Sequence, residues 1–485
     1  MILLHIDVTP VARVGGLLLC GLAGVMLIPA AVDAAFDNAD WTAFVESAAV
    51  TGFIGGAMVL ATAHAGPFEL NLRQAFLLTV ACWLAVTAFA ALPFLGLGLD
   101  YTDAFFEAIS GITTTGSTVI SGLDHSPPGI LLWRSLLQWV GGLGIIVMAI
   151  VILPFLRVGG MQLFHTESSE RSEKVVPSAF HLSAWIVAIY VTLTGLCAVL
   201  YGIGEMSAFD AVNHAMATLS TGGYSTHDAS FAYFQDPATQ WTGTVFMLAG
   251  ALPFVAYIRF AKGERRAFWR DSQIRSLLRF LALSALAMAG WLWLTQDIAF
   301  VDALRLTAFN ITSVVTTTGF ASDDYGAWGA LAVGAFLVFT FIGGCTGSTS
   351  GAIKIFRHQV IWIVLRGQLM RLISPRRVVI LRYSGRTLPP DVPVSVLAFV
   401  AVFMATVGFF TIALAGMGLD LQTALSASAT AITNVGPGLG PVVGPATNFA
   451  SLPDAAKWLL SIAMLLGRLE IFSVLVLFDP EFWRS

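Results

Sequence analysis

The sequence has few charged residues for its length, and this scarcity is its most informative property. Asp, Glu, Lys and Arg together make up 11% of the 485 residues, whereas hydrophobic residues make up 57% and the mean hydropathy is +0.81. In soluble domains, charged residues supply about a quarter of the chain. The composition therefore excludes an ordinary soluble protein and predicts a chain whose main solvent is lipid.

Cysteine is also scarce and has no pattern. Cys20, Cys82, Cys197 and Cys345 lie in apolar segments without paired spacing, which argues against a disulfide framework and a thiolate metal site. The sequence contains no His-Glu-x-x-His pair, no Gly-x-Ser-x-Gly elbow and no Walker-type phosphate loop. We therefore predict that the chain is not an enzyme, has no catalytic residues, and takes neither an organic cofactor nor nucleic acid.

Long apolar runs are present where a multi-pass membrane protein needs them. Residues 14–31, 75–97, 131–155 and 398–417 are each near the roughly 20 residues that cross a bilayer as a helix. The first run is too long for a removable signal peptide, so we expect it to be a true span. The pattern predicts about ten long helices and four half-length ones in the lipid bilayer.

The basic residues gather on one side of these runs. Of the 25 Lys and Arg residues, all but Arg134, Arg305, Lys457 and Arg468 fall in connections that we assign to the same side, and the opposite connections are acidic. By the positive-inside rule, the basic side faces the cytoplasm. We therefore expect a protein of the cytoplasmic (inner) membrane with both termini in the cytoplasm and an acidic outer side that attracts cations.

One unit of structure occurs four times along the chain. Each copy has a long apolar run, a short amphipathic stretch, a Thr/Ser/Gly cluster and a second long apolar run. The amphipathic stretches are too short to cross a bilayer and predict re-entrant helices; they are residues 103–112, 208–219, 303–314 and 422–432.

These repeats predict an all-α membrane protein in which two N-terminal transmembrane helices precede four helix, re-entrant pore helix, filter loop and helix units around one central pore. The expected segments are residues 1–70 for the two-helix part and 71–158, 159–264, 265–375 and 376–485 for the four pore repeats.

The Thr/Gly clusters have the chemistry of a cation filter. Non-helical backbone at membrane depth is tolerated only where protein or a watery cavity surrounds it. Carbonyl and threonine oxygens can replace the hydration shell of potassium, and glycine permits the required backbone angles. The alternative is ordinary packing of small residues between helices, which four copies on one face disfavour. The expected potassium ligands are Thr114, Thr115, Gly116, Ser220, Thr221, Gly222, Thr317, Thr318, Gly319, Asn434, Val435 and Gly436.

A second glycine-rich stretch predicts a break within a span, and we expect it to form a mobile constriction beneath the filter. A close-packed helix contact is the alternative. Its residues are Gly343, Gly344, Cys345, Thr346, Gly347, Ser348, Thr349, Ser350 and Gly351. Arg468 lies well inside the last span, where facing the pore is less costly than facing lipid, and there it would repel cations or bind this loop. Lys354 either assists or snorkels to the membrane surface, and snorkelling is favoured.

Three smaller features have simpler interpretations. Arg134 begins a span on the external side, where a snorkelling anchor is the default and a brace for the first loop is the alternative. His227 and Asp228 are too few to make a metal site, so we expect an external loop contact. Residues 354–386 predict a helix that lies on the membrane or continues out of it.

Several motifs resemble the Trk/Ktr/HKT superfamily of potassium transporters, and its TrkH branch in particular. The similar stretches are Trp133-Arg134-Ser135 with residues 138–144, then residues 220–228, 343–354 and 434–440. The resemblance implies a homodimer with one pore per subunit that assembles with a cytosolic nucleotide-binding regulatory subunit of the TrkA type. It also implies that Gly116, Gly222, Gly319 and Gly436 determine selectivity. Relatives that favour sodium have serine at the first of these positions, so potassium preference is implied.

The sequence thus predicts potassium uptake through a channel-like pore that is gated by the glycine-rich loop and Arg468. A cation-coupled symporter that uses the same pore, with H⁺ or Na⁺ as the coupling ion, is the alternative, and the residues leave it open. A transporter of an organic solute would instead need inverted repeats and charged residues at the membrane midplane.

Overall fold

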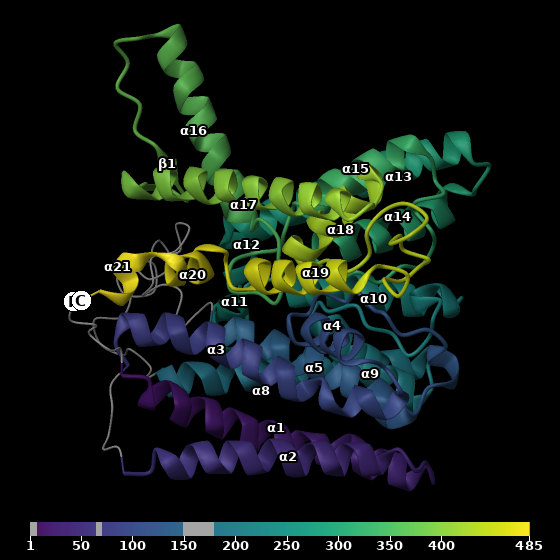
Figure 1. Cartoon of the computed structure of the whole chain (residues 1–485). Helices are drawn as coiled ribbons and strands as arrows, with labels where there is room; N and C mark the ends of the chain where they lie inside the picture. The colour runs from purple at the N-terminus through teal and green to yellow at the C-terminus, as the bar shows by residue number, and fades with distance from the viewer. Residues whose placement is uncertain (1–6, 65–69, 149–178, 485) are drawn as a thin grey trace.

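The structure, a computed structural model, describes residues 7–64, 70–148 and 179–484. Within these ranges the chain is predominantly helical, which confirms the predicted all-α class (Figure 1). The basic connection that contains residues 157–174 lies outside the described residues, so its position stays a prediction.

Two long helices precede the repeated units. α1 (Thr9–Ala35) and α2 (Trp41–Ala61) pack along each other at one edge of the bundle (Figure 1). A methyl group added to Gly16 would lie 2.8 Å from the carbonyl oxygen of Gly55, so the two backbones nearly touch. Small residues permit this close packing between membrane helices.

The four copies of the unit follow in chain order, and each contains a long helix, a half-length helix, a loop and a second helix. They are α3 (Leu72–Ala90), α4 (Tyr101–Ile112) and α5 (Pro128–Val147); α8 (Ala179–Ile203), α9 (Ala208–Leu219) and α10 (Pro237–Ala251); α13 (Ser272–Thr295), α14 (Phe300–Val315) and α15 (Ala330–Thr340); and α17 (Asp391–Gly416), α18 (Leu421–Thr433) and α19 (Asp454–Arg468). The half-length helices coincide with the four predicted re-entrant stretches to within three residues. The outer limits of the five predicted segments stay predictions.

The expected spans are present among the described residues, although several are broken. Seven helices are long and apolar enough to cross a membrane alone. Two further spans are bent pairs, in which α10 meets α11 (Phe254–Ala261) at 92° and α19 meets the segment Phe472–Phe478 at 105°. The described residues thus give up to nine candidate spans, against about ten expected. The chain also breaks between α15 and α16 (Ile355–Ile373), where the glycine-rich stretch was expected to interrupt a helix. The chain is a multi-pass membrane protein.

α16 leaves the bundle and crosses the direction of α17 (Figure 1). It leads to a short antiparallel hairpin of β1 (Arg382–Tyr383) and β2 (Arg386–Thr387). The remaining short elements are η1 (Leu92–Leu97), η2 (Leu123–His125), η5 (Ser230–Tyr233), α12 (Ala267–Arg270), α20 (Phe472–Leu475), η6 (Val476–Phe478) and α21 (Pro480–Trp483).

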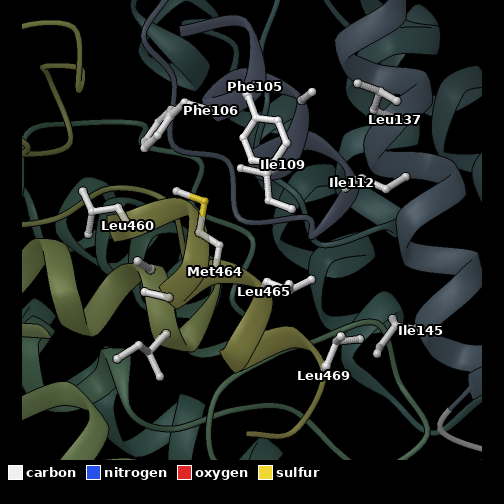
Figure 2. Close-up of a cluster of buried hydrophobic side chains, with 14 of the residues drawn as sticks. Phe105, Phe106, Ile109, Ile112, Leu137, Ile145, Leu460, Met464, Leu465 and Leu469 are labelled. Atoms are coloured by element: carbon white, nitrogen blue, oxygen red, sulfur yellow. The ribbon is translucent and has the colours of Figure 1, made fainter. Parts of the chain in front are cut away.

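Apolar packing holds the half-length helices inside the bundle. α4 packs against both α5 and α19, and Figure 2 shows Phe105 and Ile109 of α4 between Met464 of α19 and Leu137 of α5. Every residue of α4 from Ala104 to Ile112 is buried. A helix this short cannot cross the bilayer, so its chain must turn back at mid-depth next to other protein segments.

Side-chain caps explain where three of these helices begin. The side chains of Asp100, Ser207 and Asp420 accept hydrogen bonds from the backbone amides of Asp103 (2.8 Å), Asp210 (3.1 Å) and Thr423 (3.0 Å). These caps satisfy amides that a helix start leaves unpaired. The opposite ends, with their unpaired carbonyl groups and partial negative charge, therefore lead into the Thr/Gly loops.

Candidate functional site

The four Thr/Gly loops share one backbone conformation. One or two residues after each half-length helix, a non-glycine residue has a left-handed φ angle: 52° at Thr114, 51° at Thr221, 59° at Thr317 and 57° at Asn434. Such angles are uncommon outside glycine and cluster at functional sites. Two residues later each loop has a glycine with positive φ, at Gly116 (87°), Gly223 (81°), Gly319 (85°) and Gly436 (106°).

Contacts between the loops close into a ring. A methyl group added to Gly116 would collide with the carbonyl oxygen of Gly222, and one added to Gly223 would collide with that of Thr318. One added to Gly319 would collide with the carbonyl oxygen of Val435.

The cycle closes on the first loop. A methyl group added to Gly436 would lie 2.6 Å from the carbonyl oxygen of Thr115. A cycle of four such contacts requires that the loops surround one axis. It also explains the glycines, because a side chain at any of the four would strike the neighbouring loop.

The second loop is shifted by one residue from the sequence prediction. We expected Gly222 to match Gly116, but the positive φ and the ring contact both belong to Gly223. The residues equivalent to Thr114, Thr115 and Gly116 are thus Thr221, Gly222 and Gly223, and Ser220 ends the α9 helix. In the other three loops the predicted residues occupy equivalent positions.

A cavity of about 70 Å³ lies at one end of the ring. Its lining includes Gly116, Gly223, Gly319 and Gly436, together with side chains from the segments that follow the loops, among them His227. The left-handed residues lie at the other end of the loops, next to the half-length helices.

The glycine-rich stretch, residues 343–351, lies against the end of the loops that is next to the half-length helices, which we call the inner end. The Thr349 hydroxyl accepts from Thr221 Oγ1 at 3.1 Å, and the Gly351 amide donates to Thr317 Oγ1 at 2.7 Å. The Ala352 amide donates to the carbonyl oxygen of Thr433 at 2.9 Å. The stretch therefore contacts the second, third and fourth loops, and α10 holds its far side through the Ala251 carbonyl group.

Arg468 joins this contact from the last bent span. Its guanidinium donates to the carbonyl oxygen of Thr349 at 2.9 Å, and the residue is 3% exposed. Its Nε and Nη2 atoms have no hydrogen-bond partner among the described residues. Glu470, two residues away, pairs instead with Arg357 at 2.6 Å. Arg468 is thus placed at the glycine-rich stretch, one of the two positions that we expected.

The prediction for Lys354 was wrong. The side chain does not snorkel but is buried, and its ammonium group donates to the carbonyl oxygen of Ser350. The lysine side chain extends back into the glycine-rich stretch because the stretch offers a buried carbonyl oxygen four residues earlier. In a straight helix, that oxygen would accept a backbone hydrogen bond instead.

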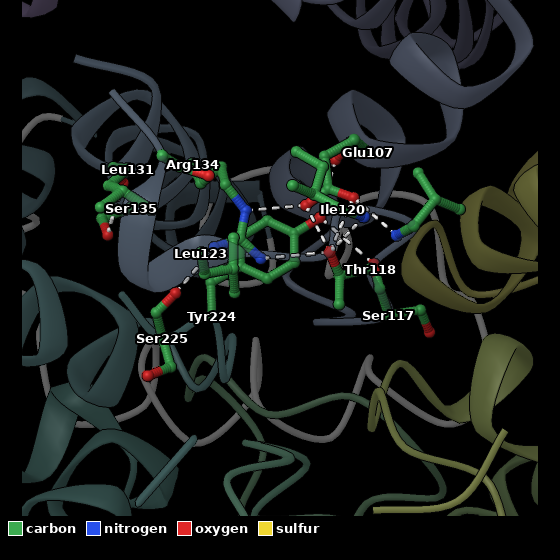
Figure 3. A network of polar contacts seen from close by, with 12 residues as sticks. Glu107, Ser117, Thr118, Ile120, Leu123, Leu131, Arg134, Ser135, Tyr224 and Ser225 are labelled. Carbon is green, nitrogen blue, oxygen red and sulfur yellow. Dashed lines mark hydrogen bonds and ion pairs between the residues drawn. The ribbon is translucent and has the colours of Figure 1, made fainter. Parts of the chain in front are cut away.

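The default prediction for Arg134 was also wrong, and the alternative holds. Arg134 is 1% exposed and pairs with Glu107 at 2.8 Å (Figure 3). It also donates to the carbonyl oxygen of Ser225 at 2.7 Å and lies over the Tyr224 ring at 4.1 Å. A buried arginine requires such partners, and these lie far away in the sequence.

Gln138 is a further contact residue that the sequence interpretation did not single out. Its amide nitrogen donates to the carbonyl oxygen of Gly222 at 2.6 Å, and its amide oxygen accepts from the Tyr224 amide at 3.0 Å. The side chain thus holds the second loop from both sides of Gly223. A polar residue one turn after Arg134, within the otherwise apolar run of α5, was the available signal.

His227 makes the external loop contact that was predicted. Its ring forms an ion pair with Asp124 at 2.5 Å and lies 3.6 Å from Asp210. Burial alone would lower the pKa of His227, but hydrogen bonds and charge from Asp210 and Asp124 outweigh it and raise the pKa above its usual value. Asp228 accepts from the Gly122 amide at 3.0 Å. These contacts join the segments that follow the first two loops.

The four cysteines are free in the structure. Among the described residues, no group of three or more His, Cys, Asp or Glu side chains could hold a metal ion.

The TrkH family model, described as a cation transport protein, matches residues 42–485. The chain belongs to the TrkH family. It is 52% identical over 423 residues to the Trk system potassium uptake protein TrkI of Halomonas elongata, with 86% of each chain covered. It is 35% identical over 483 residues to the Trk system potassium uptake protein TrkH of Escherichia coli, with 98% of this chain and 99% of that protein covered.

The fold agrees with a solved member of the TrkH family. The crystal structure of the potassium transporter TrkH from Vibrio parahaemolyticus superposes with a TM-score of 0.91 at 35% identity. The match covers 99% of this chain and 100% of that one. The resemblance stated from the motifs is thereby confirmed.

Proposed function

We propose that the chain takes up potassium ions across the cytoplasmic membrane through a pore formed by its four Thr/Gly loops. The observation that carries the proposal is the closed cycle of contacts among Gly116, Gly223, Gly319 and Gly436. Four loops around one axis can surround a dehydrated cation with oxygens. The names of the relatives, which are potassium uptake proteins, support the choice of ion.

The proposed filter uses the carbonyl oxygens of Thr115, Gly222, Thr318 and Val435. The C-terminal ends of four half-length helices lead into these loops, and their partial negative charge favours a cation there. Potassium is stripped of water more easily than sodium, and filters built from carbonyl groups exploit this difference. The hydroxyl groups of Thr114, Thr221 and Thr317 and the carboxamide oxygen of Asn434 would offer further oxygens at the inner end.

The proposed gate is the glycine-rich stretch together with Arg468. The stretch hydrogen-bonds to the inner ends of three loops, so it blocks the path below them unless it moves. Arg468 adds a positive charge at the same level and binds the stretch through Thr349. Lys354 holds the stretch from the other end. Displacement of this stretch would open the path.

The proposed assembly is a homodimer in the inner membrane, with both termini in the cytoplasm, that works with a cytosolic nucleotide-binding subunit of the TrkA type. The name "Trk system" that the relatives carry supports a function with more than one component. The basic segment that includes α16 and the β1–β2 hairpin leaves the bundle and offers a surface to such a subunit (Figure 1).

The function can be tested by uptake of radioactive rubidium into proteoliposomes with potassium or sodium as competitor. We expect potassium to compete and sodium to fail. In the Gly116→Ser variant, the added side chain would collide with the Gly222 carbonyl group, so the ring must widen. We expect the preference for potassium over sodium to fall by about tenfold, or about 1.4 kcal/mol.

Gly98→Ser is the matched control. Gly98 also has a positive φ of 78°, but open space surrounds the position of an added methyl group, so this variant has the backbone strain without the collision. It should keep the preference of the unmodified protein. Absence of rubidium uptake, or equal competition by sodium in the unmodified protein, would contradict the proposed function.

A further inference from the structure

A belt of polar side chains lies behind the loops. Glu107, His214 and Asn310 each stand nine residues before the positive-φ glycine of their loop, and each is 0% exposed. We call these three residues the belt. In the fourth unit, the equivalent residue is Ala427.

Each belt residue holds the segment that follows its own glycine. The Glu107 carboxylate accepts from the Val119 amide at 3.0 Å, three residues past the glycine. His214 Nε2 hydrogen-bonds to the Ser225 hydroxyl at 2.9 Å, two residues past it. The outgoing segments are thus fixed to the half-length helices from inside the protein.

The segments that follow the third and fourth loops are also fixed to their half-length helices. Asn310 accepts from the Ser322 amide at 3.1 Å. In the fourth unit, the neighbouring Ser426 takes over and donates from its hydroxyl to the carbonyl oxygen of Leu439 at 3.1 Å. A polar group of the half-length helix therefore fixes the outgoing segment in all four units.

The first unit differs from the others because its belt residue, Glu107, is part of an ion pair. Glu107 binds Arg134, whose guanidinium also donates to the Ser225 carbonyl group of the second loop's segment and to the Thr118 hydroxyl of the first (Figure 3). The Tyr224 hydroxyl donates to the carbonyl oxygen of Glu107 at 2.8 Å. One guanidinium fork thus spans two neighbouring loops.

We propose that Glu107 and Arg134 are positioning residues that couple the first and second loops and so set the ion preference of the pore. This inference rests on the proposed function. Thr118 and Tyr224 lie two residues and one residue past Gly116 and Gly223, so a movement of the ion pair reaches the ring directly.

The burial of the pair makes the coupling stiff. Removing one partner of a buried ion pair leaves an uncompensated charge, and the surrounding groups must then rearrange. Arginine suits this place because its planar fork can bind a carboxylate, a carbonyl and a hydroxyl group at once, whereas lysine presents a single point of charge.

The test compares Glu107→Gln, Arg134→Lys and the double variant Glu107→Gln/Arg134→Gln in the rubidium uptake assay, with thermal midpoints measured in parallel. We expect Glu107→Gln to lower the potassium-over-sodium preference by about tenfold, equivalent to about 1.4 kcal/mol. Arg134→Lys should fall between this variant and the unmodified protein. The double variant should regain thermal stability, because no charge is left unpaired, yet keep the low preference.

Arg305→Gln is the control. Arg305 lies on α14 and contacts Gln240 and Asp302, so its removal should leave the preference unchanged. If the single variants fail to fold, the double variant and Thr118→Val, which deletes the hydroxyl that bridges the pair, decide the question. An unchanged preference in those variants would overturn the inference. A failure of the unmodified protein to select potassium would instead refute the proposed function.

Discussion

The one-residue shift in the second loop makes a direct prediction, because Gly222 and Gly223 are adjacent and only the second is assigned to the ring. An alanine at position 223 must adopt a left-handed φ near 81°, which costs about 1–2 kcal/mol. Its methyl group would also collide with the backbone carbonyl of Thr318, and such overpacking costs about 1–3 kcal/mol. The total of about 2–5 kcal/mol can be relieved only if neighbouring loops separate.

An alanine at position 222 meets a different neighbour. Its methyl group would approach the carboxamide of Gln138, which is the free end of a side chain and can rotate away. The cost is then the loss of two hydrogen bonds, about 1 kcal/mol each. No left-handed backbone angle is involved at this position.

We therefore expect Gly223→Ala to lower the potassium-over-sodium preference by at least about tenfold and Gly222→Ala to lower it by less. The assay is rubidium uptake into proteoliposomes with potassium or sodium as competitor, and Gly98→Ala controls for backbone strain without a collision. A large loss of preference in Gly222→Ala together with normal behaviour of Gly223→Ala would refute the register that we assign.

Two further predictions concern the gate and the outer mouth. Deletion of residues 344–350, or Arg468→Ala, should raise rubidium flux severalfold without a regulatory subunit, because each removes part of the obstruction; reduced or unaltered flux in both would contradict the gate. The His227 contact should be strongest where Asp124 is ionised and His227 is protonated. Since the pKa of His227 is raised, its stabilising contribution is present below the usual histidine pKa and is lost as the pH rises through the raised value. The pKa of Asp124 is lowered, chiefly by its hydrogen bond to His227. The contact is therefore lost in acid only as the pH falls through this lowered value. The Asp228 amide donates to Asp124 Oδ2 at 3.4 Å, so its protection factor, which corrects for the intrinsic rise of exchange with pH, should fall as the pH rises through the raised pKa of His227. Asp124→Asn should weaken that fall, and Asp124→Asn/Asp210→Asn, which removes both carboxylates beside His227, should abolish it.

The sequence predicted the half-length helices well for a physical reason. Each combines a length that cannot cross the bilayer, an acid near its start and a Thr/Gly cluster at its end, so three independent signals agree. The register of the second loop was harder, because the run from Thr221 to Gly223 contains two adjacent glycines. Gly223 differs from Gly222 in its positive φ angle and in standing nine residues after His214. The composition reveals neither property.

The errors at Lys354 and Arg134 share one origin. A lone cation near the end of an apolar run is normally assumed to face lipid and to extend toward water. Both side chains are instead buried, Arg134 against residues that are distant in the sequence and Lys354 against the Ser350 carbonyl group that the break between α15 and α16 leaves available. Glu107 lies 27 residues before Arg134, and the Ser225 carbonyl group comes from a different unit. Contacts across units cannot be inferred from spacing within one of them.

The covalent linkage of the four units explains why the site is only approximately symmetric. In a ring of four identical chains, every loop would need the same support, and a charged pair would occur four times or not at all. Here an ion pair supports the first loop, an imidazole and an amide side chain support the next two, and the Ser426 hydroxyl supports the fourth. The glycine-rich stretch likewise contacts three inner ends and departs from a single unit. A single chain can therefore keep the ring of glycines, which geometry demands of all four loops, while each unit acquires its own brace and one unit alone provides the proposed gate.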